Sequence, residues 1–346
     1  MTRAILRGVR RPGHRALGAL TPLILFAVTI SSAGAVAATT GTSAAPAGAS
    51  GTVSWQGIAL PNPKDDIGPV WTGLVCTSVT DCVISGFDDN SSYGALALKT
   101  HDGGHAWAWR YHAVTPGVDY ELDAVMCTIG SNCLAMGSAN SGEELAGSTD
   151  GEKTWHPVDP ARWDRSAFRI VPESIACSSA MCYVVGIHWT KNTYSVNALV
   201  ATPNAGRTWR TIRLQAGPVP DELEACDPGT TCWALSTHGE LIVSNDGGHS
   251  WAPLPSPPFL RQLSGGESEY SCPTAQVCVA ITDKVWRSTD GGRTWTRVTS
   301  PKGAGPPVFG PAYSASYSVV DCLIVQSCFL VGGWNGTGYL WHGTFG

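Results

Sequence analysis

Short apolar runs recur along most of the chain and are separated by turns rich in glycine, proline and aspartate. Residues 74–76 and 82–84 are two such runs on either side of a short turn segment. Runs of this length, bounded by turn residues, are typical of β-strands. Only 14% of the residues are charged, and the chain holds 40 glycines and 23 prolines. The pattern predicts an all-β protein with short connections.

The N-terminus has the pattern of a secretory signal peptide. An apolar run at residues 17–30 is followed by small residues at 35–37, and it is preceded by five arginines, Arg3, Arg7, Arg10, Arg11 and Arg15. The apolar run is too short to span a membrane comfortably. We expect residues 1–37 to be a Sec-type signal peptide, residues 38–51 to be a flexible linker, and the mature protein to be secreted. An uncleaved N-terminal anchor is the open alternative.

Twelve cysteines form six close pairs, and the first members of successive pairs lie 46 to 51 residues apart. Periods of this length are typical of propellers and solenoids. Structural zinc sites favour closer spacing between cysteine ligands, so disulfides are the better interpretation for an exported chain. Apolar residues flank each pair, which predicts two antiparallel strands bridged across a short loop. The predicted bridges are Cys76–Cys82, Cys127–Cys133, Cys177–Cys182, Cys226–Cys232, Cys272–Cys278 and Cys322–Cys328.

A second repeated motif lies between the cysteine pairs. It reads S-T-D-G-E-K-T-W at residues 148–155, and close copies stand at 244–251 and 288–295. Looser copies stand at 100–107 and 202–209. A short acidic or amide side chain can accept backbone N–H bonds in a tight turn, and glycine permits positive φ there. We expect structural roles for Asp102, Asp150, Asn204, Asp246 and Asp290.

These copies resemble the Asp box, or BNR repeat, of sialidases, xyloglucan-cleaving propellers, the sortilin ectodomain and photosystem II assembly-factor propellers. The resemblance covers nearly all of residues 52–346 and implies a single β-propeller. Six cysteine pairs imply six four-stranded antiparallel blades. The last repeat ends without a fourth strand, and residues 53–60 look like the missing one. We therefore expect the N-terminal strand to complete the last blade and close the ring.

Acidic residues gather in the segments expected on one face. Signal cleavage would leave 17 basic against 27 acidic residues, a formal net charge of −10, which argues against a nucleic-acid partner. Asp123, Glu173 and Glu222 stand at the start of innermost strands, and we expect them to ring the channel mouth. Two interpretations remain open, a solvated rim or a site for a basic partner or a cation such as Ca²⁺. No other cofactor is expected.

The same face is expected to carry a basic and aromatic cluster, which would suit a sugar or an anionic group. Ordinary loop packing is the alternative. The candidate binding residues are Arg162, Trp163, Arg165, Arg169, His188, Trp189 and Tyr194.

The resemblance to sialidases implies three arginines around a substrate carboxylate and a tyrosine nucleophile helped by a glutamate. Weak catalytic candidates are Arg169, Arg162, Arg261, Glu269 and Tyr270. The acidic rim would repel an anionic sugar. We find no serine-hydrolase, phosphate-loop or zinc-protease motif in the sequence. The favoured hypothesis is a secreted, monomeric, non-catalytic module that binds a protein or a cell-surface glycan through its linking loops. The alternative is an exo-glycosidase of sialidase type.

Overall fold

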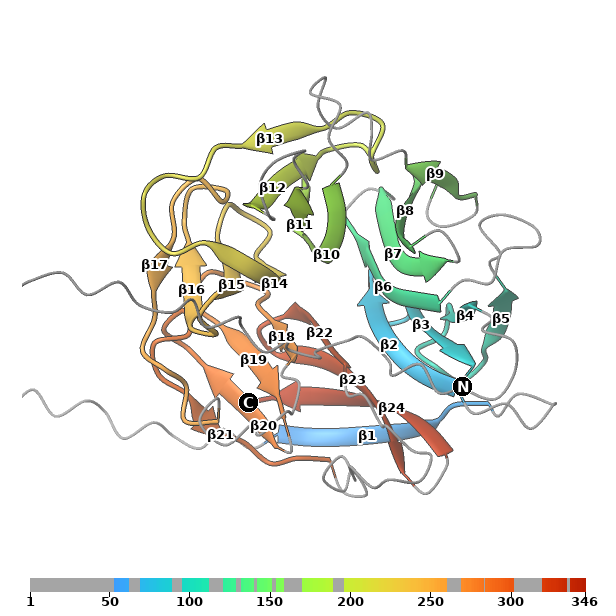
Figure 1. Cartoon of the computed structure of the whole chain (residues 1–346). Helices are drawn as coiled ribbons and strands as arrows, with labels where there is room; N and C mark the ends of the chain where they lie inside the picture. The colour runs from blue at the N-terminus through green and yellow to red at the C-terminus, as the bar shows by residue number, and fades with distance from the viewer. Residues whose placement is uncertain are drawn as a thin grey trace, which may run out of the picture. The chain divides into compact units, whose positions relative to one another are not determined.

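The computed structural model describes the chain from residue 53 onward as six four-stranded antiparallel sheets (Figure 1). The described residues are 53–61, 69–88, 95–111, 121–128, 132–139, 142–150, 154–158, 170–188, 196–259, 269–282, 284–301, 319–334 and 337–346. Every regular element within these ranges is a β-strand, as the turn-rich, low-charge sequence predicts. The expected fold class, an all-β six-bladed propeller, is confirmed.

Each of the first three blades is formed by four consecutive strands. Blade 1 contains β2 (Pro69–Cys76), β3 (Cys82–Asp88), β4 (Ala95–Thr100) and β5 (Ala108–Tyr111). Blade 2 contains β6 (Glu121–Cys127), β7 (Cys133–Ala139), β8 (Gly142–Ser148) and β9 (His156–Val158). Blade 3 contains β10 (Ile170–Cys177), β11 (Cys182–His188), β12 (Val196–Thr202) and β13 (Arg210–Ile212).

The remaining blades repeat this order, except that the last takes its outer strand from the N-terminus. Blade 4 contains β14 (Pro220–Cys226), β15 (Cys232–Ser236), β16 (Leu241–Ser244) and β17 (Ala252–Pro253). Blade 5 contains β18 (Glu269–Ser271), β19 (Cys278–Ile281), β20 (Val285–Ser288) and β21 (Thr296–Arg297). Blade 6 contains β22 (Val319–Ile324), β23 (Ser327–Trp334), β24 (Thr337–Phe345) and β1 (Val53–Ala59).

The first strand of each blade is the innermost, and these six strands touch one another in order around a ring. β2 packs against β6, β10 against β6 and β14, β18 against β14 and β22, and β22 returns to β2. Apolar clusters fill the spaces between successive sheets, for example between blades 3 and 4 and between blades 4 and 5. Facing sheets therefore bury each other's apolar side chains, which is the main stabilising term.

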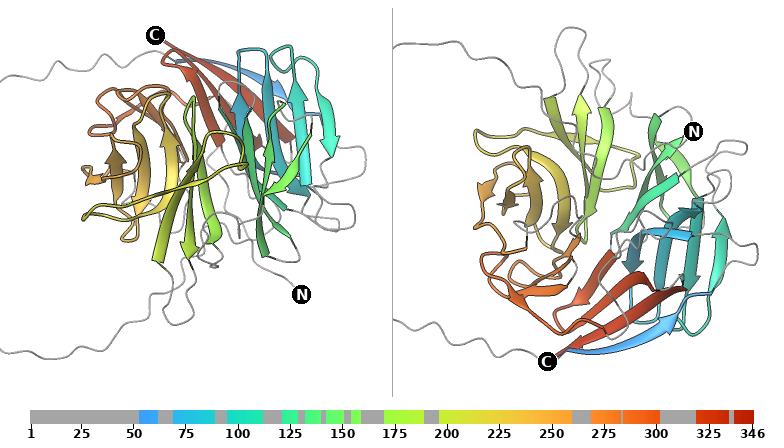
Figure 2. Two further views of the ribbon diagram at one scale, coloured as in Figure 1. Left: turned by 90° about the horizontal axis from the view of Figure 1, so that it is seen from above. Right: turned by 60° about the horizontal axis from the view of Figure 1, so that its bottom comes forward.

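The ring is closed by β1, which runs antiparallel to β24. The pairing extends from Val53 opposite Phe345 to Ala59 opposite Tyr339, and the blue and red strands lie together in Figure 2. Trp55 also donates its indole N–H to the carbonyl of Thr299 in the preceding blade, at 2.7 Å. The prediction that the N-terminal strand completes the last blade is confirmed.

All six predicted disulfides are present, and the described residues include no free cysteine. Five of them join directly opposed positions of the first and second strands, and in blade 5 Cys272 directly follows β18. The bridged Cα atoms lie 3.9 to 4.1 Å apart. The bridges close very short loops, so a loop-entropy estimate gives about 2 kcal/mol for each. The six hairpins that they staple form a rigid rim at one end of the propeller.

The five Asp-box-like turns, called Asp turns from here on, share one hydrogen-bond pattern. In blade 4 the hydroxyl of Ser244 donates to Asp246 Oδ1 at 2.8 Å, and the same oxygen accepts the N–H of Ser250 at 2.9 Å. Gly247 and Gly248 adopt φ values of +70° and +88°, which L side chains rarely reach. In blade 3 an amide replaces the acid, and Asn204 Oδ1 accepts the N–H of Thr208 at 2.8 Å.

The Asp turns of blades 3, 4 and 5 also contact the preceding blade. A Cβ on Gly248 of blade 4 would stand 2.5 Å from Leu199 of blade 3, and one on Gly206 of blade 3 would stand 2.6 Å from Val158 of blade 2. Trp233 of blade 4 donates its indole N–H to the carbonyl of Gly291 in blade 5, at 3.1 Å. The turns therefore hold neighbouring sheets together as well as joining two strands.

We expect Asp246→Ala to lower the free energy of unfolding by about 1–2 kcal/mol, because Ser244 and Ser250 lose their acceptor. Asp246→Asn should lower the free energy of unfolding by less than half as much. In blade 3 the amide oxygen of Asn204 already accepts the equivalent backbone hydrogen bond. Urea denaturation of the oxidised protein measures both. Equal losses for the two variants would contradict the assigned hydrogen bonds.

Candidate functional site

A cavity of about 780 Å³ lies at the centre of the ring, at the end that carries the disulfide hairpins. It is lined by the last residues of all six innermost strands and by parts of the hairpins that follow them. We call it the channel cavity. Its residues next to the first cysteine of each pair are Val75, Met126, Ala176, Ala225, Ser271 and Asp321. At this level the wall is apolar in blades 1 to 4 and polar in blades 5 and 6.

Asp321, which is half-buried, is one of two acidic groups that the innermost strands place in this wall. Its Oδ2 accepts the backbone N–H of Cys76 at 2.6 Å, which ties blade 6 to blade 1. Ser271 of blade 5 accepts the N–H of Cys322 at 2.9 Å, so three blades meet here. Burial raises the pKa of the Asp321 carboxyl to about 6, although hydrogen bonds from Cys76, Cys322 and Ser271 favour its charged form.

Glu224 is the second acid, and it reaches the wall through a β-bulge. Leu223 pairs with Ala234 and Ala225 with Trp233, so Glu224 is an extra residue without a partner position on β15. The side chain is only 9% exposed, and its Oε1 has no hydrogen-bond partner. Such bulges re-aim side chains and are frequent beside binding sites.

Two further carboxyl groups act on Glu224. Burial raises its pKa well above the usual value, and the negative charges of Glu222 on β14 and Glu269 on β18 raise it further. The three glutamates therefore lie within electrostatic reach of one another on the innermost strands of blades 4 and 5. The structure brings together one acid predicted at the channel mouth, Glu222, and one weak catalytic candidate, Glu269, around a residue that sequence reasoning had not singled out.

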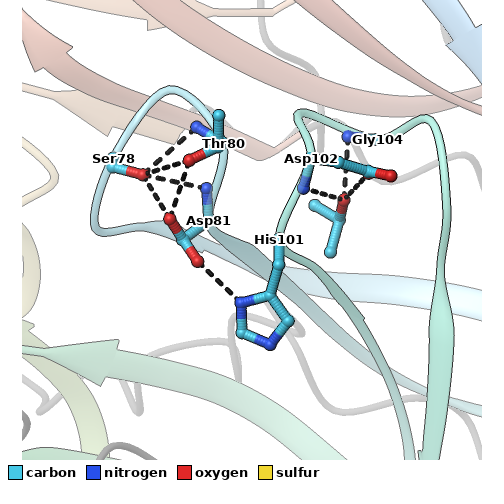
Figure 3. A network of polar contacts seen from close by, with 7 residues as sticks. Ser78, Thr80, Asp81, His101, Asp102 and Gly104 are labelled. Carbon is cyan, nitrogen blue, oxygen red and sulfur yellow. Dashed lines mark hydrogen bonds and ion pairs between the residues drawn. The ribbon is translucent and has the colours of Figure 1, made fainter.

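A polar network stands at the rim of the cavity in blade 1 (Figure 3). Asp81 Oδ1 lies 2.6 Å from His101 Nδ1, and Asp81 Oδ2 accepts the hydroxyl protons of Ser78 and Thr80 at 2.6 and 2.8 Å. The Ser78 hydroxyl, followed by His101 and Thr80, lowers the pKa of Asp81 to about 2. Ser78 donates to the carboxylate and not to the imidazole, so this order of contacts does not activate the serine as a nucleophile.

Two exposed apolar side chains stand beside this network. Val79 in the blade 1 hairpin is 52% exposed, and Ile324 in the blade 6 hairpin is 54% exposed. Both line the channel cavity. Blades 1 and 6 are neighbours through β2 and β22, so the rim combines an apolar side with a polar one.

Most residues of the predicted basic and aromatic cluster fall outside the described part of the chain. These are Arg162, Trp163, Arg165, Arg169, Trp189 and Tyr194, together with Arg261. His188 is the last residue of β11, and only its backbone is described. The cluster therefore stays a prediction.

The predicted acidic positions occupy the innermost strands as expected from their spacing. Asp123 and Glu173 stand at the register shifts of β6 and β10, and the Glu173 side chain is exposed. Glu222 is also exposed, and it lies farther from the hairpin than Glu224. Only the backbone of Asp123 is described, so a complete acidic ring stays a prediction.

The weak catalytic candidates Tyr270 and Glu269 are both described, and their catalytic role stays a prediction. They are successive residues of β18, whose side chains point to opposite faces of a strand. The Tyr270 ring is 5% exposed and packs against Trp295 and Phe259, with ring centres 5.8 and 6.1 Å apart. Tyr270 thus serves the interface between blades 4 and 5.

An alignment of the six repeats contains the signal for both acids. The residues two before the first cysteine are apolar or aromatic except in blade 4, namely Leu74, Val125, Ile175, Glu224, Tyr270 and Val320. One position later, the single acid is Asp321. A charged residue at a position that is otherwise apolar in a repeat marks a departure from the structural pattern.

The described residues contain no group of three or more His, Cys, Asp or Glu side chains placed to hold a metal ion. Calcium at the acidic loops stays a prediction, because several of those loops lie outside the described ranges. In the part of the chain that is described, no helix has the length and apolar character needed to cross a membrane.

No family model matches the sequence, and no curated protein matches it. Solved structures that resemble it are all-β propellers of low identity. A protein of unknown function from Dyadobacter fermentans is 9% identical with a TM-score of 0.56, over 85% of this chain and 99% of that one. Trypanosoma rangeli sialidase, in complex with the inhibitor DANA, is 12% identical with a TM-score of 0.53, over 84% and 59%.

A further similar structure is YCF48 bound to D1 peptide, 17% identical with a TM-score of 0.46, over 83% of this chain and 96% of that one. This chain spans about three fifths of the length of the sialidase. The likenesses to the Dyadobacter protein and to the sialidase establish the fold and leave the activity open. The class of this protein is therefore a six-bladed, disulfide-stapled β-propeller.

We expect the Asp321 carboxyl to make stability fall as pH rises from 4.5 to 7. Its native pKa of about 6 exceeds the ordinary 3.8, so over this window the folded state keeps a proton that the unfolded state loses. Between these two pH values, the free energy of unfolding of wild type should fall by about 2 kcal/mol more than that of Asp321→Asn. Urea denaturation at both pH values measures it, and an identical pH response of the two proteins would contradict the assignment.

Proposed function

We propose that this chain is an extracellular, non-catalytic recognition propeller whose ligand is a protein or a cell-surface glycan. The observation that carries the proposal is the channel cavity of about 780 Å³, which has a stapled rim, an apolar wall and exposed Val79 and Ile324 at its mouth. Cavities of this size with a few polar groups are typical of ligand sites. The loops that link successive blades are proposed as a second contact surface.

Several features of the described residues support recognition over catalysis. Tyr270 is packed within an interface, and Ser78 hydrogen-bonds to a carboxylate. The apolar clusters and disulfides hold the wall in one shape, which lowers the entropic cost of binding a partner. Six disulfides are consistent with an extracellular location, where such bonds persist.

The test is a binding screen of the oxidised protein against extracellular proteins and a glycan array, followed by the double variant Val79→Asp/Ile324→Asp. Two charges on the apolar rim should lower the affinity for a specific ligand at least tenfold, because the charges must lose their hydration when the ligand contacts them. Thr211→Asp is the matched control, since Thr211 is exposed on the outer strand β13 and lies outside the cavity wall.

A parallel assay uses fluorogenic glycosides, including a sialoside, with wild type and Arg169→Ala. We expect no turnover by either protein. Turnover that is lost in the Arg169 variant would replace this proposal with the exo-glycosidase alternative. A folded protein that binds nothing in the screen would also overturn it.

A further inference from the structure

Glu224 is costly for the fold and is not needed by it. A carboxyl oxygen without a hydrogen-bond partner in a side chain that is 9% exposed destabilises a protein. The corresponding residues in the other blades are apolar or aromatic and join the packing between sheets, as Leu74 and Ile175 do. The bulge that admits Glu224 is an added irregularity, because β14 already has a register shift between Pro220 and Glu222.

The surroundings of Glu224 indicate what this carboxyl group could bind. It lines the channel cavity, and one of its carboxyl oxygens has no hydrogen-bond partner. Glu222 and Glu269 do not line the cavity, but their negative charges act on Glu224 from the innermost strands of blades 4 and 5. A carboxyl group with an unpaired oxygen and two further negative charges in reach favours a ligand that brings both positive charge and hydrogen-bond donors.

The order of apolar and acidic residues along the cavity indicates what kind of positively charged group would fit it. Val79 and Ile324 make the mouth apolar, whereas Glu224 lies two residues before Cys226, further into the ring. A lysine or arginine side chain has an apolar stem and a charged end, which matches this order of surfaces. A volume of about 780 Å³ exceeds one such side chain, so part of the backbone that carries it would also enter.

We propose that the channel cavity binds the charged end of a lysine or arginine side chain of a protein partner, with Glu224 as the buried anchor. Glu222 and Glu269 supply further negative charge. The inference rests on the recognition function proposed above and specifies its partner as a basic segment of polypeptide.

Binding would be coupled to proton release. Burial, Glu222 and Glu269 raise the pKa of Glu224, so below that pKa the free protein holds a proton there that passes to solvent when a cation takes its place. Affinity for the cation should therefore rise with pH, by up to about tenfold per pH unit below that pKa. Among the elements that pack against β14, β12 and β15 carry no titratable side chain. The others carry Glu173 on β10, Tyr183 and His188 on β11, and Glu269 and Tyr270 on β18.

Isothermal titration of the oxidised protein tests the proposal with a capped pentapeptide of four glycines around a central lysine. The arginine and norleucine versions and 1,5-diaminopentane are titrated beside it. We expect the lysine and arginine peptides to bind at least tenfold more tightly than the norleucine peptide. Equal binding of norleucine, or no binding of any peptide, would overturn the proposal. Diamine binding as tight as the peptide's would exclude a polypeptide source.

Glu224→Gln should reduce lysine-peptide affinity at least tenfold at pH 7.5 and remove its pH dependence. Glu240→Gln is the matched control, because Glu240 is an exposed glutamate of the same blade outside the cavity wall. Glu224→Leu, which restores the apolar pattern of the other blades, should bind no peptide and should unfold at a higher urea concentration than wild type. Unchanged binding in Glu224→Gln, or a less stable Glu224→Leu protein, would indicate a structural role.

The two proposals fail separately. A partner that is lost with the rim variant Val79→Asp/Ile324→Asp and retained by Glu224→Gln refutes the anchor and leaves the recognition function standing. A protein that binds neither peptides nor any screened partner refutes both.

Discussion

The pairing of β1 with β24 is the constraint on which the other contacts depend. Five blades can form from consecutive strands, but the sixth lacks an outer strand until residues 53–59 arrive from the other end of the chain. Closure turns the last blade into a neighbour of the first, so that Leu60 and Trp71 share an apolar cluster with Phe329 and Leu340. Only then does every innermost strand have two neighbours and the ring enclose a channel.

Local devices keep each blade in register while the ring closes. The disulfides join the first two strands at one end, and the Asp turns join the last two at the same end. In blade 1 these devices touch, since Gly103 donates its N–H to the carbonyl of Thr80. Because both are short-range, each blade can form its own turns before it meets its neighbours. Gly206 and Gly248 in these turns then pack against the preceding blade, so the same turns also stabilise the contact between neighbouring blades.

The channel wall shows where this regular scheme is broken. Asp321 is half-buried and satisfied, because Cys76 donates to it across the junction of blades 6 and 1. Glu224 is buried, and one of its carboxyl oxygens forms no hydrogen bond to any neighbouring strand. A repeat protein that departs from its own pattern at a cost in stability does so where function requires it. The proposal of a basic ligand connects this departure with the charges of Glu222 and Glu269.

The sequence by itself determined the number of blades, the disulfide partners and the strand that closes the ring, because each repeats at a fixed spacing or completes a repeat. Only the tertiary structure revealed the group of Glu222, Glu224 and Glu269. These residues come from two blades, and the bulge that turns Glu224 inward depends on the register between β14 and β15. Burial and mutual repulsion arise only when separate strands meet, so linear spacing marks Glu224 as unusual but cannot place it in the channel.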